Sequence, residues 1–269
     1  MKAGKAYFVD EDSIVRQIWG RKDVVLLIFA GASAEFAVHR SVDWLFFTGA
    51  LPADPLGRLF STATYARNIV FAKTEQTYAV IDRMNQIHAA IEQARGRKIP
   101  DWAYRDVLYM LIDYSIRADE ALYRKLNADE KEEVYEVFQR VGHRMQIPGL
   151  PANYTAWAAD RVLTLNTNYV WSKYSHKLHH AYQHHLGIGR YALLEEAQYM
   201  LLPDRLLEML DATRPEVLPV LTRLLKFFRW MRANDMLIRL LVPNQYLGQL
   251  KEMEQPRGCP FHRLKSAFV

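Results

Sequence analysis

The chain has 269 residues, of which 50% are hydrophobic and 12% aromatic, and its formal net charge is +5. A chain of this length and composition can bury one substantial core, which excludes an intrinsically disordered protein. The single cysteine, Cys259, excludes an intrachain disulfide and a cysteine-based zinc site. It favours a reducing compartment, and we expect a cytoplasmic protein.

The positive charge is spread along the chain, without a basic tract or interleaved aromatic residues. This pattern argues against nucleic-acid binding, and it leaves open a peripheral contact with anionic lipid. The first residues lack the apolar segment of a secretory signal. The longest apolar run, 24–34, is too short to cross a bilayer and is followed by Glu35, so it predicts a buried helix and no transmembrane segment.

Two further helices are predicted in the first third of the chain. Asp54 followed by Pro55 is typical of a helix start, with an N-cap and then a proline at the first helical position. Apolar residues recur at helical spacing over 77–95 and predict an amphipathic helix, whose apolar face also carries His88.

The middle of the chain continues the helical pattern. Residues 102–122 carry apolar side chains at helical spacing. Asn127, with Glu130 three residues later, predicts a capping box at the start of a helix that runs to about Gly142.

Four more helices are expected, at 156–185, 191–201, 204–210 and 215–241. Gly187 and Gly189 are expected to close the first of them. No stretch alternates as a half-buried strand does. The sequence therefore predicts an all-α protein, a single globular multi-helix domain over 1–269 with a partly irregular tail after Pro243.

His88 is the most informative residue, because an imidazole on an apolar helix face needs a partner. A hydrogen bond would satisfy it. A metal would also satisfy it, since neutral imidazole is a common ligand of haem iron. The pattern of this helix leaves both interpretations open.

Arg58, Ser61 and Thr62 share one face of the helix that starts at Pro55. A guanidinium beside two hydroxyls suits an anionic or oxygen-bearing ligand. Alternatively, Arg58 lies along the surface and the hydroxyls bond the preceding turn. The residues alone do not choose between these interpretations.

Five of the nine histidines lie between 176 and 185. His176, His180 and His184 fall on one helix face at a spacing that can chelate zinc or another divalent metal. No Glu-containing zinc motif accompanies them, so a partly solvated helix face is the alternative. His39, after the first apolar helix, is either a capping or core residue or part of a pocket.

Residues 15–210 resemble the latex-clearing-protein and MpaB-type oxygenase family, with the C-terminal helices and tail over 211–269 lying beyond the resemblance. The matching pieces, in chain order, are 26–36 leading into His39, 54–59 with Thr62, 82–89 with His88, 126–130 leading to Arg140, Gly142 and Pro148, and 201–203 before Leu206.

The resemblance implies an all-α domain with a buried haem pocket. It implies haem b with His88 as the axial ligand of the iron, and Arg58 and Thr62 on the helix over the opposite face, where dioxygen or peroxide would bind. Ser61 is expected to shape that face with them, and His39 is expected to contact the cofactor.

The chain departs from the rubber-cleaving members of the family at three places. Ser61 stands where they carry a lysine, and Leu108 stands where many relatives carry a histidine. The carboxylate that acts as their base has no clear counterpart, and Asp43 is the nearest acid. A small or medium apolar organic substrate is therefore expected in place of polyisoprene.

The leading hypothesis is a haem-b-dependent oxidoreductase, an oxygenase, with Arg58, Ser61 and Thr62 as catalytic residues and His88 on the iron. One alternative is a non-catalytic helical binding or scaffold protein that has lost the cofactor. The other is a divalent-metal protein that uses the face from His176 to His184.

Overall fold

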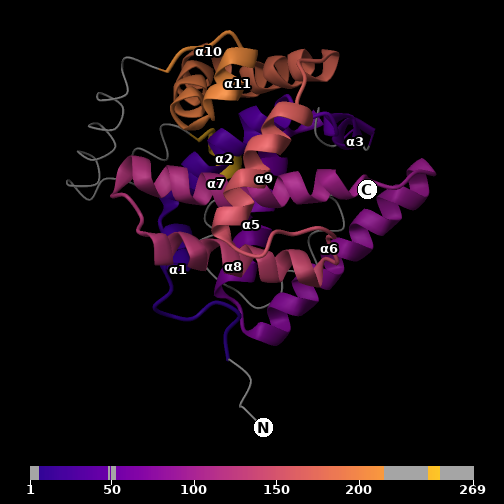
Figure 1. Ribbon diagram of the computed structural model, residues 1–269. Helices are drawn as coiled ribbons and strands as arrows, with labels where there is room; N and C mark the ends of the chain where they lie inside the picture. The colour runs from indigo at the N-terminus through magenta and orange to yellow at the C-terminus, as the bar shows by residue number, and fades with distance from the viewer. Residues whose placement is uncertain (1–5, 48, 50–52, 215–241, 249–269) are drawn as a thin grey trace.

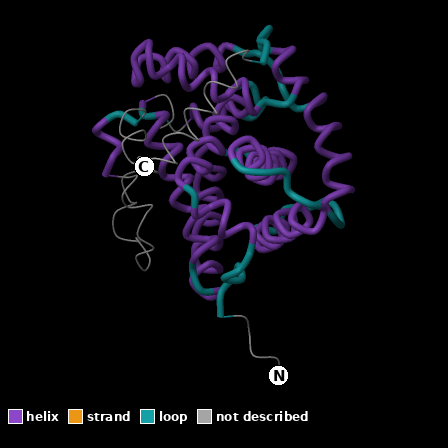
Figure 2. Tube along the Cα trace, turned by 90° about the vertical axis from the view of Figure 1, so that its left-hand side faces the viewer, coloured by secondary structure: helices purple, strands orange, loops and turns teal. Residues whose placement is uncertain are grey.

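The computed structural model describes residues 6–47, 49, 53–214 and 242–248, and in this part of the chain it contains helices and no strand (Figures 1 and 2). The prediction of an all-α protein is confirmed. The elements are α1 (Ile14–Gly20), α2 (Lys22–Ala37), α3 (Val42–Phe47), α5 (Pro55–Phe71), α6 (Thr74–Arg95), α7 (Asp101–Leu122), α8 (Ala128–Arg144), α9 (Tyr154–Thr167), α10 (Lys173–Leu201), α11 (Asp204–Met209) and the 3₁₀ turn η1 (Asn244–Tyr246).

Helices α2 and α7 form the centre of the fold, and α2 packs against both α7 and α10. In Figure 1, α10 and α11 lie above this pair, α1 and α8 lie below it, and α6 runs along the right-hand side. The predicted apolar run at 24–34 is buried within α2, as expected. No helix in the described residues has both the length and the apolar character needed to span a membrane.

The crossing of α2 and α7 is close because α2 carries a glycine where the two helices meet. A Cβ atom added at Gly31 would lie 2.4 Å from ring atoms of Tyr114 on α7. Real Cβ atoms do not approach other atoms so closely, and the Tyr114 ring is fully buried and cannot move aside freely. Gly31 therefore sets the spacing of the two central helices.

We expect Gly31→Ala to lower the free energy of unfolding by about 1 to 3 kcal/mol, the usual cost of overpacking a core. The matched control is Gly189→Ala on α10, where an added Cβ meets nothing within 4 Å. Because alanine favours helix over glycine, Gly189→Ala should be neutral or stabilising by up to about 1 kcal/mol. Urea unfolding followed by circular dichroism measures both. Equal effects of the two substitutions would show that Gly31 does not set the helix spacing.

The helix starts predicted from capping residues are confirmed. Asp54 accepts a hydrogen bond from the Gly57 amide at 2.9 Å, with Pro55 at the first position of α5. Asn127 Oδ1 accepts from the Glu130 amide at 2.9 Å, and Glu130 Oε2 accepts from the Asn127 amide at 2.9 Å, which completes the capping box of α8.

The prediction of one helix over 156–185 is wrong. α9 ends at Thr167, and the next five residues cross to α10 outside any helix. There Val170 donates to the Val38 carbonyl at 2.7 Å, and Arg40 donates to the Asn168 carbonyl at 3.0 Å. These bonds between distant segments replace the helical ones, and the Ser172 side chain caps α10.

The break expected near Gly187 is present. Gly187 has φ 74° and ψ 165°, a backbone conformation that glycine tolerates and L-residues rarely adopt. It separates the two halves of α10, of which the second contains the predicted helix over 191–201. The predicted helix over 215–241 and Cys259 lie outside the described residues.

Candidate functional site

His88 lies in the second half of α6, where the helix is less well covered than at its start. Val80 and Ile81 in the first half are buried. Ile87, His88 and Ile91, which continue the same apolar face, are only partly covered by the described residues. An apolar face that continues beyond its covering atoms is typical of a ligand pocket.

The His88 imidazole carries a buried nitrogen without a partner. Nδ1 is shielded from solvent and makes no hydrogen bond to any residue that the structure describes, and the Tyr104 ring of α7 packs edge-on against the imidazole, with ring centroids 5.1 Å apart. Burial, with a smaller contribution from the Arg58 charge and against the influence of Glu92, lowers the pKa of His88 to about 4. The imidazole is therefore neutral near pH 7, which is the form that binds metals.

The lowered pKa of His88 has a consequence for acid stability. The unfolded chain takes up a proton at His88 near pH 6.5, whereas the folded chain does so only near pH 4. Because the unfolded state then binds more protons, the free energy of unfolding should fall as the pH drops through this window. Urea unfolding of the cofactor-free chain at pH 7 to 4 should show a smaller fall for His88→Gln than for the unchanged chain. Parallel pH dependences would contradict the lowered pKa.

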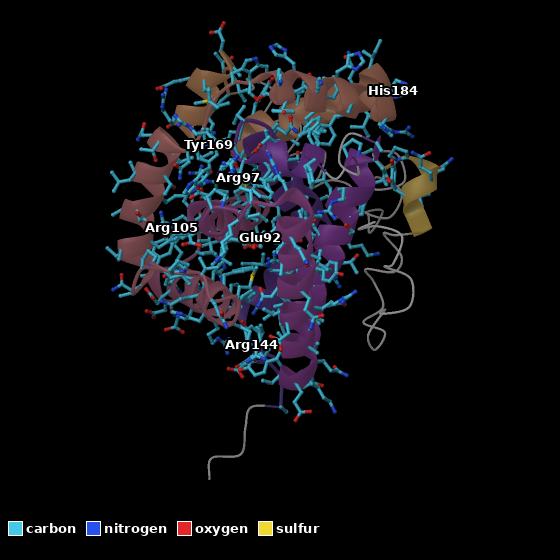
Figure 3. The ribbon with its side chains drawn as sticks, turned by 90° about the vertical axis from the view of Figure 1, so that its right-hand side faces the viewer. Glu92, Arg97, Arg105, Arg144, Tyr169 and His184 are labelled. Carbon is cyan, nitrogen blue, oxygen red and sulfur yellow. The ribbon has the colours of Figure 1, made fainter. Side chains whose placement is uncertain are left out.

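Glu92 lies one helical turn after His88 on the same face of α6 (Figure 3). Its Oε1 accepts hydrogen bonds from the Tyr104 hydroxyl at 3.2 Å and from the Ile99 amide at 2.8 Å. Burial, aided by Glu92, raises the pKa of Tyr104, which stays protonated and donates. The sequence reasoning missed Glu92 as a site residue, although its i, i+4 spacing from His88 was the available signal.

Arg58 reaches the same site from α5. It is partly buried, burial lowers the pKa of its guanidinium, and its positive charge acts on His88. The structure thus brings together two of the residues predicted from the sequence.

Ser61 and Thr62 both bond the preceding turn. Each hydroxyl donates to the Arg58 carbonyl at 2.9 Å, and Thr62 is exposed. Hydroxyls that bond the preceding turn were the alternative to a ligand-binding face that the sequence left open. A hydroxyl that donates in this way still has lone pairs with which to accept a bond from a ligand.

His39 is placed in a separate buried polar group, which agrees with the core role that the sequence left open for it. Its Nε2 donates to Asp106 Oδ2 at 3.0 Å, and its Nδ1 is 2.6 Å from Ser41 Oγ. The ring is fully buried, and Asn168 also donates to Asp106. With both nitrogens occupied by protein partners, His39 connects α2 to α7 and the segment before α10.

Leu108 and Asp43, which the resemblance singled out, both have other protein contacts. Leu108 is buried and packs beside Gly142, so it is a core residue. Asp43 forms an ion pair with Arg95 at 2.6 Å, so its carboxylate is already neutralised by a cation.

Two histidines of α10 bond aromatic residues of the chain. His176 Nε2 accepts from the Trp171 indole at 2.6 Å, and His179 Nδ1 lies 3.0 Å from the Tyr191 hydroxyl. His184 lies at the top of the molecule, well apart from Glu92 (Figure 3). Within the ranges that the structure describes, no group of three or more His, Cys, Asp or Glu residues is placed to hold a metal ion.

The described residues form an all-α protein in which a neutral histidine lies on an incompletely covered face of α6, close enough to Arg58 of α5 to feel its charge. The family model described as ER-bound oxygenase mpaB/B'/rubber oxygenase, catalytic domain, matches residues 16–233. The chain belongs to this family and carries an oxygenase catalytic domain. No curated protein and no solved structure matches it significantly.

Proposed function

We propose that the chain is a haem-b-dependent oxygenase that acts on a small or medium apolar organic substrate, with His88 as the axial ligand of the haem iron. The observation that carries the proposal is the neutral His88 imidazole, whose buried Nδ1 has no partner. Leaving such a nitrogen without a partner costs free energy, so the site is incomplete without a further group. Membership of an oxygenase family supports an iron cofactor as that group.

The residues present fit the cofactor. A rigid helix orients the His88 ring, and the negative charge of Glu92 one turn away makes the imidazole more basic. When bound, haem supplies an iron centre that binds and activates dioxygen or peroxide. Arg58 offers guanidinium N–H donors that stabilise developing negative charge on oxygen. His39 is left out of the proposed site, because both of its ring nitrogens already have protein partners.

The apolar side chains next to His88 on α6 and the hydroxyls next to Arg58 on α5 support the substrate class. Ser61 and Thr62 keep acceptor capacity one turn beyond Arg58. Ile87 and Ile91 extend the apolar face on either side of His88 and offer an apolar substrate a dry contact. Water excluded by such a substrate would strengthen the electrostatic contacts of Arg58.

An absorption spectrum and an elemental analysis of tag-free protein, freshly purified, test the proposal. Stoichiometric iron together with a Soret band supports it. Protein with neither metal nor colour, and with no Soret band after addition of hemin, would favour the binding or scaffold alternative. Zinc without colour would overturn both, and the tag-free preparation prevents the histidine-rich α10 from loading metal on an affinity column.

A further inference from the structure

A short segment beyond the family match packs against the start of α5. The family model ends at residue 233, and the described chain resumes at residue 242. In this segment, drawn in yellow in Figure 3, Val242 and Tyr246 are both buried. Tyr246 belongs to η1, which contacts α5.

The Tyr246 hydroxyl bonds the residue that begins α5. It donates to Asp54 Oδ1 at 2.6 Å, and the same oxygen accepts the Gly57 amide at 2.9 Å. Burial and this bond raise the pKa of Tyr246 to about 12, so the hydroxyl keeps its proton at neutral pH. The N-cap carboxylate of α5 is thus held from both sides, by its own helix and by the distant segment.

Two further contacts fix the Tyr246 ring. The ring stacks on Phe60 of α5 with centroids 5.6 Å apart and planes inclined by 26°. Nδ1 of His185, on α10, lies 3.4 Å from the phenolic oxygen. Because the single hydroxyl hydrogen goes to Asp54, that oxygen can accept from His185. Tyr246 therefore contacts both the N-cap and the second turn of α5, and it connects them to α10.

Arg58 lies between these two contacts, at the fourth residue of α5. A small rotation or tilt of the first turn would move its guanidinium relative to His88. The contacts of Tyr246 with Asp54 and Phe60 oppose such a movement from both ends of that turn.

We propose that Tyr246 is a positioning residue, which holds the first turns of α5 and so keeps Arg58 in place relative to His88. This inference rests on the proposed function, in which Arg58 acts beside the iron. It assigns a role in the site to a part of the chain that the family model does not cover.

Hydrogen exchange on the cofactor-free protein tests the positioning itself. Tyr246→Phe removes the hydroxyl and keeps the ring on Phe60. We expect the amides of Gly57 and Arg58 to exchange about fivefold faster, the usual effect of one lost hydrogen bond. Asp54→Asn keeps an acceptor for both donors and should stay within about twofold of the unchanged chain. The control is Tyr135→Phe, which removes another hydroxyl of a buried tyrosine, bonded to the Pro151 carbonyl.

Cyanide binding to the haem-loaded protein tests the consequence for the site. In Tyr246→Phe the Soret band should persist, while the affinity for cyanide falls about threefold to tenfold. Tyr135→Phe should leave that affinity unchanged even if it lowers overall stability. Unchanged exchange at Gly57 and Arg58, equal effects in the control, or faster exchange with unchanged cyanide affinity would each overturn the inference. If the chain takes up no haem, the proposed function fails, and the role of Tyr246 in the site fails with it. The hydrogen-exchange result is independent of haem and still shows whether Tyr246 holds the first turns of α5.

Discussion

His88→Ala should lose the Soret band or shift it grossly. The substitution removes the proposed iron ligand, and α6 carries no other histidine. His39 cannot replace it, because its ring nitrogens already bond Asp106 and Ser41. Loss of a residue that only orients a ligand typically weakens metal binding 10- to 100-fold, so loss of the ligand itself should weaken haem binding by about 100-fold or more. Hemin titration followed at the Soret maximum measures this change.

Two controls separate ligation from folding. His143→Ala removes an exposed imidazole on α8 and should leave the haem spectrum unchanged. His88→Gly with added free imidazole should regain part of the Soret intensity, because the small ligand can enter the space that the side chain vacates. A His88→Ala protein with normal circular dichroism and an unchanged haem spectrum would rule out axial ligation by His88.

The elements that the sequence predicted well are those specified by neighbouring residues. The start of α5 follows from Asp54 and Pro55, and the start of α8 follows from Asn127 and Glu130, because each cap forms within one turn. His88 was found for the same reason, since the helical spacing of α6 places it on the apolar face.

The features that the sequence reasoning missed depend on distant parts of the chain. No glycine or proline marks the break before α10, which is held by backbone bonds of Val170 and Arg40 across more than a hundred residues of chain. The sequence also could not show that His39 bonds Asp106 of α7. The role of Glu92 also depends on such packing, because its bond to Tyr104 requires the arrangement of α6 against α7, and the sequence showed only its spacing from His88.

The buried ion pair between Glu35 and Arg161 shows how such distant contacts hold the site's framework. Arg161 of α9 donates from Nη1 to Glu35 Oε1 at 2.8 Å and from Nη2 to Oε2 at 2.6 Å. Its Nε donates to Asp113 of α7 at 3.1 Å. The hydroxyls of Tyr114 and Tyr169 also donate to Glu35. The group joins α2, α7, α9 and the segment before α10.

The ion pair is fully withdrawn from water, with Arg161 4% exposed and Glu35 0% exposed. Burial by itself would lower the pKa of Arg161, but Glu35, Tyr169 and Asp113 together outweigh it and raise the pKa well above its ordinary value. The positive charge of Arg161 therefore persists in the core. The arrangement is stable because each charge has a partner and most of its hydrogen-bonding capacity is used.

Arg161→Leu should lower the free energy of unfolding by about 3 to 5 kcal/mol, because it leaves the Glu35 carboxylate buried without a cation. That loss is a large part of the stability of an ordinary domain, so unfolding by urea should be measured at low temperature. The double variant Glu35→Leu with Arg161→Leu removes both charges and should recover part of the lost stability. Such a recovery shows that the single variant is destabilised by the unpaired Glu35 charge and not only by altered packing.

The matched control is Arg144→Leu on α8. Arg144 also pairs with a carboxylate through two nitrogens, at 2.8 and 2.5 Å from the oxygens of Asp82, but the two side chains are 44% and 43% exposed. Water screens such a pair, so its loss should change stability by less than about 1 kcal/mol. An Arg161→Leu protein that is no less stable than Arg144→Leu, or a double variant less stable than Arg161→Leu alone, would show that burial of this ion pair does not hold the central helices together.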